Sequence, residues 1–469
     1  MRGGWTRRAA RLALLGLVLA PATAVAQEPP PPADPPKPFT LPPVERYGLE
    51  NGLDVRLVRY GDVPKVTARL VVQTGNVDEA PDEVWLANLT GALMEQGTTS
   101  RPPERIASDL AGMGGSLSLT VGVNEVAMEG SVLSEFAPAL VELLADVARD
   151  PALPPAQLPR VRADLVRGLA IARTEAPSLA RATFLEALYP AHPYGRVLPS
   201  SEQVGRHTID DVRAFYARSF GAARARLYVV GAFGEPEVRS AVARAFAGWE
   251  RGGTPTPVAL SPSTRRAVYL VDRPGAVQST ISIGLPTVPV GDADHLPLLV
   301  TNMLLGGYRS SRITNNIREQ KGYTYNPRSS IGTRLGTAFY VQVADVTTSA
   351  TGASLGEILY EIRRLRAEPP TQDEVRGAQS FLAGSFVLDN SSRLGIVNQL
   401  AFLDLHGLGE DHLRTYVPRV LATTAVEIQE MARRHLDDER MPIVVVGDRV
   451  AVLEQVRPYG EIVDVSPTP

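Results

Sequence analysis

Two side chains with useful chemistry, Arg318 and Tyr325, lie seven residues apart in the stretch NNIREQKGYTYNPRSS. A guanidinium is a permanently charged fork of hydrogen-bond donors, and a phenol can donate to an oxygen that gains negative charge. Such a pair suits the binding of a polarised carbonyl group. The residue types alone nevertheless favour a plainer interpretation, in which Arg318 forms a structural ion pair and Tyr325 packs in a core.

The other reactive side chains give little support for metal chemistry. The chain has no cysteine, so it forms no disulfide and offers no thiolate ligand to a metal. None of its six histidines has a second histidine or an acid at a known metal-binding spacing. The histidines are His192, His207, His295, His406, His412 and His435. Glu95, at a helix end, and the basic run RRLRAE from Arg363 are interpreted as solvated helix surfaces, and His435 as part of a helix end.

One helix has clear limits but carries almost no chemistry. The stretch WLANLTGALMEQGTTSRP, residues 85–102, predicts an amphipathic helix that stops at Gly97. Asn88, Gly91 and Ala92 lie about one turn apart on one face of this helix. The pattern raises the question of whether this is an ordinary packing helix or a site that has lost its reactive residues.

The same order of elements occurs twice along the chain. Each half starts with an apolar strand pattern, at Val66 and at Val277, and continues with a helix that ends in glycine. Each half closes with a β-branched strand that runs into glycine, and these VVG strands, at Val229 and Val445, are 216 residues apart. The nearly constant offset predicts a duplicated domain. Hairpin signals favour the α+β class, with an antiparallel sheet packed against helices in each domain.

The composition along the chain predicts an exported protein with two domains. A basic start, a short apolar run and Ala24-Val25-Ala26 are typical of a cleavable export signal rather than a membrane span. The predicted segments are a signal peptide (1–26), a proline-rich linker (27–43), an N-terminal domain (44–252), an interdomain linker (253–264) and a C-terminal domain (265–469). We therefore expect a periplasmic location.

The charge of the chain argues against nucleic acid as a partner. Its formal net charge is −3, and removal of the signal, with its four arginines, makes it more negative. A mildly acidic protein does not suit a polyanionic partner. With 44% hydrophobic and 21% charged residues, the chain has the composition of a globular protein, and no membrane span is expected.

These elements together resemble the insulinase/pitrilysin metallopeptidases and their relatives, the mitochondrial processing peptidase and bacterial processing-peptidase-like proteins. The resemblance extends from about Val44 to the C-terminus and rests on four stretches in the family's order. They are TGNVDEAPDEVWLANLTGALMEQGTTSRP, FLEALYPAHPYGRVLPSSEQV, DDVRAFYARSFGAARARLYVVGAF and LLGGYRSSRITNNIREQKGYTY. The resemblance implies two homologous metallopeptidase-like domains that form half of a clam-shell, and a structural role for His192.

The resemblance also implies that the zinc site of the N-terminal domain is degenerate. In the family this helix carries His-x-x-Glu-His, whose histidines bind zinc and whose glutamate activates the zinc-bound water. Asn88 and Ala92 stand at the histidine positions and Gly91 at the glutamate position. A third ligand, a glutamate on a later helix, corresponds to Leu169 or a residue next to it. No metal is therefore expected in this chain.

The resemblance gives Arg318 and Tyr325 a catalytic role. In the family, an arginine and a tyrosine at this spacing reach across a cavity, bind the substrate backbone and stabilise the oxyanion of the reaction. The stretch GGSLSLTVG resembles the family's exposed edge strand, to which an extended peptide adds as a further strand. The implied peptide-binding residues are Gly115, Ser116, Leu117 and Ser118.

Two functional hypotheses follow from these predictions. In the first, the chain is the catalytically incomplete subunit of a periplasmic heterodimeric zinc metallopeptidase. Arg318 and Tyr325 would then act in trans on extended or unfolded peptides, and zinc would be held by the partner subunit. In the second, the chain is a non-catalytic scaffold or peptide-binding protein of the same fold. An active stand-alone peptidase would need a metal site that the sequence does not show.

Overall fold

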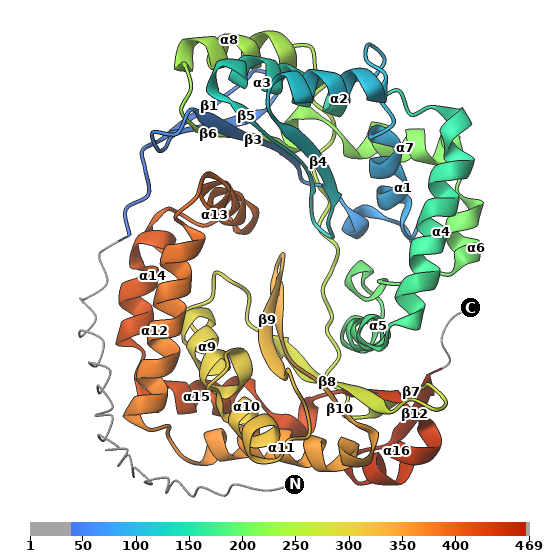
Figure 1. Ribbon diagram of the computed structural model, residues 1–469, viewed down its shortest axis with the longest axis vertical. Helices are drawn as coiled ribbons and strands as arrows, with labels where there is room; N and C mark the ends of the chain where they lie inside the picture. Colours follow the sequence, from blue (N-terminus) through green and yellow to red (C-terminus); the bar gives the residue numbers. More distant parts are fainter. Residues whose placement is uncertain (1–38, 466–469) are drawn as a thin grey trace, which may run out of the picture. The chain divides into compact units, whose positions relative to one another are not determined.

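The computed structural model describes residues 39–465, which form two six-stranded sheets packed against helices (Figure 1). The predicted signal peptide, residues 1–26, and most of the predicted linker, residues 27–43, lie outside the described residues. The predicted α+β class is confirmed, with one sheet from each half of the chain.

The N-terminal half forms the first sheet, with the strand order β1-β2-β6-β3-β5-β4. Its strands are β1 (Val44–Gly48), β2 (Asp54–Arg59), β3 (Lys65–Val72), β4 (Ser116–Val121), β5 (Val126–Leu133) and β6 (Ala225–Gly231). Its helices are α1 (Leu86–Met94), α2 (Pro103–Gly112), α3 (Ala137–Arg149), α4 (Leu158–Thr174), α5 (Ala176–Leu188), α6 (Ser201–Arg206), α7 (Ile209–Ser219) and α8 (Glu235–Phe246).

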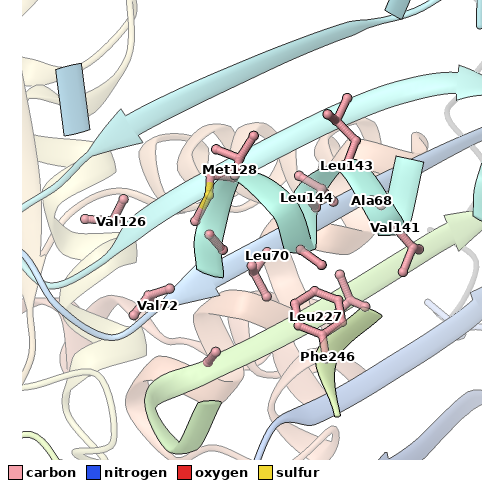
Figure 2. Close-up of a cluster of buried hydrophobic side chains, with 14 of the residues drawn as sticks. Ala68, Leu70, Val72, Val126, Met128, Val141, Leu143, Leu144, Leu227 and Phe246 are labelled. Carbon is pink, nitrogen blue, oxygen red and sulfur yellow. The ribbon is translucent and has the colours of Figure 1, made fainter. Parts of the chain in front are cut away.

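Alternation along the strands decides which face of the first sheet is buried. In β3, side chains such as Ala68 and Leu70 point to one face and lie in the main core of this half. Helix α3 packs on that face with Val141 and Leu144, and β6 contributes Leu227 (Figure 2). A fully buried leucine of this kind contributes roughly 1.5–3 kcal/mol relative to an exposed one. The core therefore lies between one face of the sheet and a layer of helices.

The C-terminal half forms the second sheet, with the strand order β12-β7-β11-β8-β10-β9. Its strands are β7 (Val268–Asp272), β8 (Gln278–Thr287), β9 (Arg328–Arg334), β10 (Thr337–Thr347), β11 (Ile443–Gly447) and β12 (Ile462–Val465). Its helices are α9 (His295–Asn302), α10 (Arg312–Thr314), α11 (Thr351–Ala367), α12 (Gln372–Asp389), α13 (Arg393–His406), α14 (Asp411–Ala422), α15 (Ala425–His435) and α16 (Arg449–Val456).

The two sheets have the same topology in five of their six positions. Strands β2, β6, β3, β5 and β4 of the first sheet correspond in order to β7, β11, β8, β10 and β9 of the second. The sixth strand differs, because β1 precedes the first repeat whereas β12 follows the second. The matching order confirms the predicted duplication.

Both sheets are mixed rather than purely antiparallel. Most neighbouring strands are antiparallel, as the hairpin signals predict, but β2 is parallel to β6, and β7 is parallel to both β11 and β12. Parallel neighbours need long connections, and here most of the helices of each half lie between the parallel strands in sequence.

Each half also covers one face of the other half's sheet with a helix. Helix α5 packs on β8 and β11 of the second sheet, where the ring of Phe184 lies edge-on, 6.0 Å from that of Phe339. Helix α13 packs on β3 and β6 of the first sheet, and its Asp404 accepts a 2.8 Å hydrogen bond from the Tyr228 hydroxyl. The two helices occupy the same position in their repeats, so each repeat places its equivalent helix on the sheet of the other repeat.

The connection between the halves contains no regular structure. Residues 251–267 form neither helix nor strand, and Arg224 donates hydrogen bonds to the carbonyls of Gly253 (3.1 Å) and Thr254 (3.2 Å). Between residues 39 and 465, none of the helices combines the length and apolarity that a membrane span needs.

Candidate functional site

Helix α1 has the limits that its sequence predicts. It spans Leu86–Met94, and Gly97 follows it with a φ of +102°, a conformation that favours glycine. The start of the helix is satisfied by Glu79, whose carboxylate accepts hydrogen bonds from the backbone N–H groups of Trp85 (3.0 Å) and Ala87 (2.9 Å). This carboxylate replaces a capping side chain at the first turn.

Glu79 is a buried acid that sequence reasoning missed. Burial raises its pKa to about 7, although its hydrogen bonds with Ala87, Asn76 and Trp85 act in the opposite direction. Its spacing does not match the capping box, in which the acid lies three residues after the cap. The sequence therefore offers no local signal for its role.

Asn88 belongs to the hydrogen-bond network of this buried acid. The side-chain oxygen of Asn88 accepts a 2.7 Å hydrogen bond from the Asn76 amide, which also donates to Glu79 at 3.0 Å. The network links the first turns of α1 to the loop that follows β3. Asn88 therefore has a structural function in the described residues.

Gly91 lies at the closest contact between α1 and the edge strand β4. A Cβ at position 91 would lie 2.5 Å from Cγ2 of Val121 and 3.0 Å from Cδ2 of Leu119. A side chain at this position would require the side chains of Val121 and Leu119 to move. The space that a glutamate would need is filled by apolar side chains.

The other two predicted zinc positions are apolar. Ala92 packs partly buried against the core of the N-terminal half, and Leu169 is fully buried on α4, a helix that contacts α1. Within residues 39–465 there is no group of three or more histidines and acids placed to hold a metal ion. The residues at Asn88, Gly91, Ala92 and Leu169 do not fit zinc, because they supply neither imidazole nor carboxylate ligands.

The structure brings Arg318 and Tyr325 together. Arg318 lies on a π-helical segment, Asn315–Gln320, which ends before Gly322, a residue with a φ of +66°. The chain then turns, so that the guanidinium carbon of Arg318 lies 4.9 Å from the centre of the Tyr325 ring. This distance lies within the range of a cation–π interaction.

The surroundings of the pair leave the tyrosine exposed and the arginine half-buried. Tyr325 is 82% exposed, so it does not pack in a core. The Arg318 side chain is 18% exposed, and its only carboxylate neighbour within residues 39–465 is Glu319, at 3.6 Å. This separation is longer than a hydrogen bond. The guanidinium therefore keeps donors available for a ligand.

The predicted peptide-binding segment lies at the edge of the first sheet. Strand β4 pairs only with β5, so its other side is open. Ser116 and Ser118 are exposed, whereas Leu117 points to the opposite face and packs against the core. Gly115 precedes the strand, at a close approach to the backbone of Ser131. The binding role of these residues remains a prediction.

Two predictions about charged groups have different outcomes. His192 is buried, and its Nδ1 accepts a 3.1 Å hydrogen bond from the backbone of Tyr194, consistent with a structural role. The interpretation of RRLRAE as a solvated surface agrees with the exposure of Arg363 and Arg364, whereas Arg366 is half-buried. Arg363 and Arg366 form ion pairs of 2.7 and 2.6 Å with Asp438, which is 1% exposed. Asp438 lies far along the chain, so the helix pattern could not reveal it.

The fold and the site define a two-domain protein of metallopeptidase type. Residues 57–200 match the family model of the insulinase (peptidase family M16) domain, and residues 206–382 match that of the peptidase M16 inactive domain. Together the two models cover more than half of the chain. The chain belongs to the insulinase (peptidase M16) family.

Three similar proteins extend over most of the chain. An uncharacterized zinc protease of Mycobacterium bovis is 27% identical over 86% of this chain and 92% of its own length. The structure of a peptidase M16 inactive domain from Pseudomonas fluorescens aligns with a TM-score of 0.81 and 20% identity, over 86% of this chain and 98% of that one. The periplasmic protease PqqL of Escherichia coli aligns with a TM-score of 0.73 and 15% identity, over 94% of this chain and 49% of that one. The structural matches show a shared fold.

Proposed function

We propose that this chain is the non-zinc subunit of a periplasmic heterodimeric metallopeptidase of the insulinase family. It would contribute Arg318 and Tyr325 to a peptide held at the zinc site of a partner subunit. One observation carries the proposal: the arginine lies beside an exposed tyrosine, while the positions that the resemblance assigns to the zinc ligands hold neutral side chains. A chain that has the arginine and the tyrosine but no zinc ligands would need a second subunit that binds zinc.

The geometry of the pair suits the recognition of a polarised carbonyl. The guanidinium stays charged at any physiological pH, and the exposed phenol can donate to the same oxygen as negative charge develops on it. Their cation–π contact at 4.9 Å restricts both side chains before substrate arrives. Pre-organised donors stabilise a transition state at a smaller entropic cost than mobile ones.

The open side of β4 supports the binding of an extended peptide. An edge strand presents unpaired backbone groups, which a peptide can satisfy by forming one more strand. Ser116 and Ser118 point outward from β4 and can contact the side chains of such a peptide. The substrate class would be extended or unfolded segments, because a folded chain hides its backbone groups.

Alignment with half of PqqL supports the need for a second subunit. This chain covers 49% of the PqqL chain, so that protease contains about as much chain again. A zinc-binding partner of similar size would correspond to the part of PqqL that this chain does not cover. The predicted export signal supports a periplasmic location for both subunits.

The test is peptide hydrolysis by the complex. The chain is purified from its source organism with its zinc-bearing partner, and the complex is then reconstituted with variants of this subunit. Arg318→Ala is expected to lower kcat/KM about 100- to 1,000-fold, which is the usual effect of removing one oxyanion donor. Tyr325→Phe keeps the ring and removes only the donor, so it should lower the rate without preventing assembly.

Matched variants separate a catalytic effect from a general one. Arg376→Ala removes an exposed arginine from α12, which pairs only with the neighbouring Asp373, and Tyr360→Phe alters an exposed tyrosine of α11. Both should hydrolyse peptide at the wild-type rate. Full activity of the Arg318→Ala complex would refute the proposed role.

One observation favours the scaffold or peptide-binding alternative. Arg318 and Tyr325 contact each other within this chain, so their interaction can be explained without a substrate. Under this alternative no zinc-bearing chain accompanies the protein, and neither variant changes any hydrolytic rate. Identification of the chains that co-purify with it therefore discriminates the two functions.

A further inference from the structure

Arg318 lies on a short helical segment that packs against another helix. The segment is the π-helical turn Asn315–Gln320, and its neighbour is α11. Ile317 of this turn is fully buried among the apolar side chains of the C-terminal half. A π-helical turn is rare and occurs frequently at functional sites. The contacts that stabilise this turn therefore bear on the position of Arg318.

The side-chain amide of Asn316 joins this turn to α11. Asn316 is 6% exposed, and its Nδ2 atom donates one hydrogen bond of 2.9 Å to Glu357 and another of 2.9 Å to Glu361. A side-chain amide nitrogen has two N–H groups, so both donors are used here. The two acceptors lie one turn apart on α11. Asn316 therefore binds two carboxylates of the same helix at once.

Glu361 is a buried carboxylate that depends on this amide. It is 4% exposed, and the polar partners of its side chain within residues 39–465 are Asn316 and, at 3.5 Å, the guanidinium of Arg364. A buried charge is costly unless it is hydrogen-bonded. Glu357 and Glu361 also repel each other, because like charges four residues apart on a helix are unfavourable. Loss of the Asn316 amide would remove the donor that both carboxylates share.

A second contact ties the chain to α11 just after Arg318. The Nζ atom of Lys321 lies 3.2 Å from a carboxylate oxygen of Glu357, and the backbone N–H of Lys321 donates to the Asn316 carbonyl at 3.1 Å. The side chains of Lys321 and Glu357 are both partly exposed, and such ion pairs contribute little to stability. The buried hydrogen bonds of Asn316 are therefore the stronger of the two connections.

We propose that Asn316 and Glu361 are positioning residues for Arg318. The inference rests on the proposed function, because it takes Arg318 to be the group that meets the substrate. The hydrogen bonds from Asn316 to α11 fix the register of the π-helical turn, and this register sets the direction of the guanidinium. A change to the α-helical register would rotate Arg318 about the axis, away from Tyr325. The 4.9 Å contact between guanidinium and ring therefore depends on an amide two residues away.

The first experiment follows the contact between Arg318 and Tyr325 in the purified chain alone. Meta-fluorotyrosine is incorporated at position 325, and its fluorine NMR shift is measured in the wild type and in Arg318→Ala, which gives the shift of the ring without the guanidinium. We expect Asn316→Ala to move the resonance at least halfway toward that reference. Asn315→Ala is the matched control, because the exposed Asn315 amide donates to the Ser310 carbonyl at 3.0 Å. This control should keep the wild-type shift.

Glu361→Met tests the same contact from α11. Methionine is similar in length and has no charge, and an apolar residue in place of a buried charge is often tolerated. This variant should also move the resonance toward the reference, and it tests the inference even if Asn316→Ala does not fold. Glu368→Met is its control, because Glu368 is the other acid that pairs with Arg364, at 2.9 Å. An unchanged resonance in both Asn316→Ala and Glu361→Met overturns the inference.

The second experiment measures hydrolysis by the reconstituted complex in two backgrounds. Asn316→Ala is expected to lower kcat about 10- to 100-fold, because a small misplacement of a catalytic group can cost about 100-fold. In a chain that already carries Arg318→Ala, the same substitution should cause no further loss, since the two residues act as a unit. A residue that only stabilises the fold would lower the rate by the same factor in both backgrounds.

The two experiments distinguish a failure of the inference from a failure of the proposed function. Full activity of the Arg318→Ala complex refutes the proposed function, whereas the fluorine shift still decides whether Asn316 and Glu361 position the Arg318 side chain. A loss of rate in Asn316→Ala that is equally large in the Arg318→Ala background overturns the positioning role.

Discussion

Strands β4 and β9 hold the same place at one edge of their sheets, but their surroundings differ in chemistry. Next to β4, helix α1 packs closely through Gly91 against the apolar side chain of Val121. Next to β9, the corresponding helical segment brings Gly306 close to the polar side chain of Ser329. Both repeats have a close approach between a helix and the edge strand, but the side chains at that contact differ.

The charged groups show the same divergence. The N-terminal half has neutral residues at Asn88, Gly91, Ala92 and Leu169, the positions that the resemblance assigns to the zinc ligands and the catalytic glutamate. The C-terminal half has Arg318 beside an exposed tyrosine. A shared backbone therefore does not imply shared chemistry. Substitutions that alter packing or hydrogen bonds test these differences experimentally.

The largest effect on stability is expected from Gly91→Glu, which places on α1 the glutamate that the resemblance implies for this position. Its Cβ would lie 2.5 Å from Cγ2 of Val121, and the substitution puts a charged side chain at a buried position beside apolar neighbours. Overpacking and burial of a charge together should cost more than about 3 kcal/mol of the free energy of unfolding. Urea denaturation of the purified chain measures this change.

Gly168→Glu is the matched control for this substitution. Gly168 is exposed on α4, and no neighbouring atom lies within 4 Å of an added Cβ. Replacement of a helical glycine there should be neutral, or stabilising by about 0.5–1 kcal/mol. If both variants unfold at the same urea concentration, the packing of α1 on β4 does not exclude a glutamate at position 91.

A smaller effect is expected from Glu79, which supports α1 from a buried position. Burial raises its pKa to about 7 in the folded state, above the ordinary glutamate value of 4.5. The folded state then binds the proton more tightly than the unfolded state, so this contribution to stability is complete below pH 4.5 and is lost as the pH rises through 7. The loss amounts to at most about 3 kcal/mol.

Glu79→Gln tests this pH dependence. The amide cannot ionise, so the variant should lose less stability than the wild type between pH 4.5 and pH 7.5 in urea denaturation. Glu104→Gln, on the surface of α2, is the control and should follow the wild-type profile. If the stability of the wild type and of Glu79→Gln changes equally with pH, the raised pKa of Glu79 is contradicted.

The smallest effects concern the two contacts by which the halves exchange helices. Tyr228 donates to the carboxylate of Asp404 on α13 at 2.8 Å. Tyr194 has only neutral partners for its hydroxyl among the described residues: it donates to the Leu335 carbonyl at 3.2 Å and accepts from the Asn124 amide at 2.9 Å. Hydrogen bonds to charged groups contribute more than those to neutral groups. Tyr228→Phe should therefore cost about 2 kcal/mol and Tyr194→Phe about 1 kcal/mol. Equal losses in thermal unfolding would show that the two contacts are energetically equivalent.

Several parts of the fold and site could be predicted because their signals are local. The glycine after α1, the apolar strand from Val66 and the repeated strands depend on local patterns, and these were predicted correctly. The edge position of β4 was expected from its resemblance to the family's edge strand. The parallel strand pairs were not, since a strand pattern does not indicate which distant strand will lie beside it.

Contacts between distant residues account for what was missed. Asp438 forms ion pairs with Arg363 and Arg366, which the helix pattern alone could not reveal, and Glu79 caps a helix from an unusual spacing. Both contacts are decided by tertiary packing.

The sequence by itself determined which residues could do chemistry and which could not. Asn88, Gly91, Ala92 and Leu169 carry no zinc-binding group of the family's kind, whatever the fold. Only the tertiary structure decided that Val121 fills the space at Gly91, and that Arg318 lies beside an exposed Tyr325. The reason is physical: a residue's functional groups belong to its own side chain, whereas its room, partners and exposure depend on neighbours that folding brings from elsewhere in the chain.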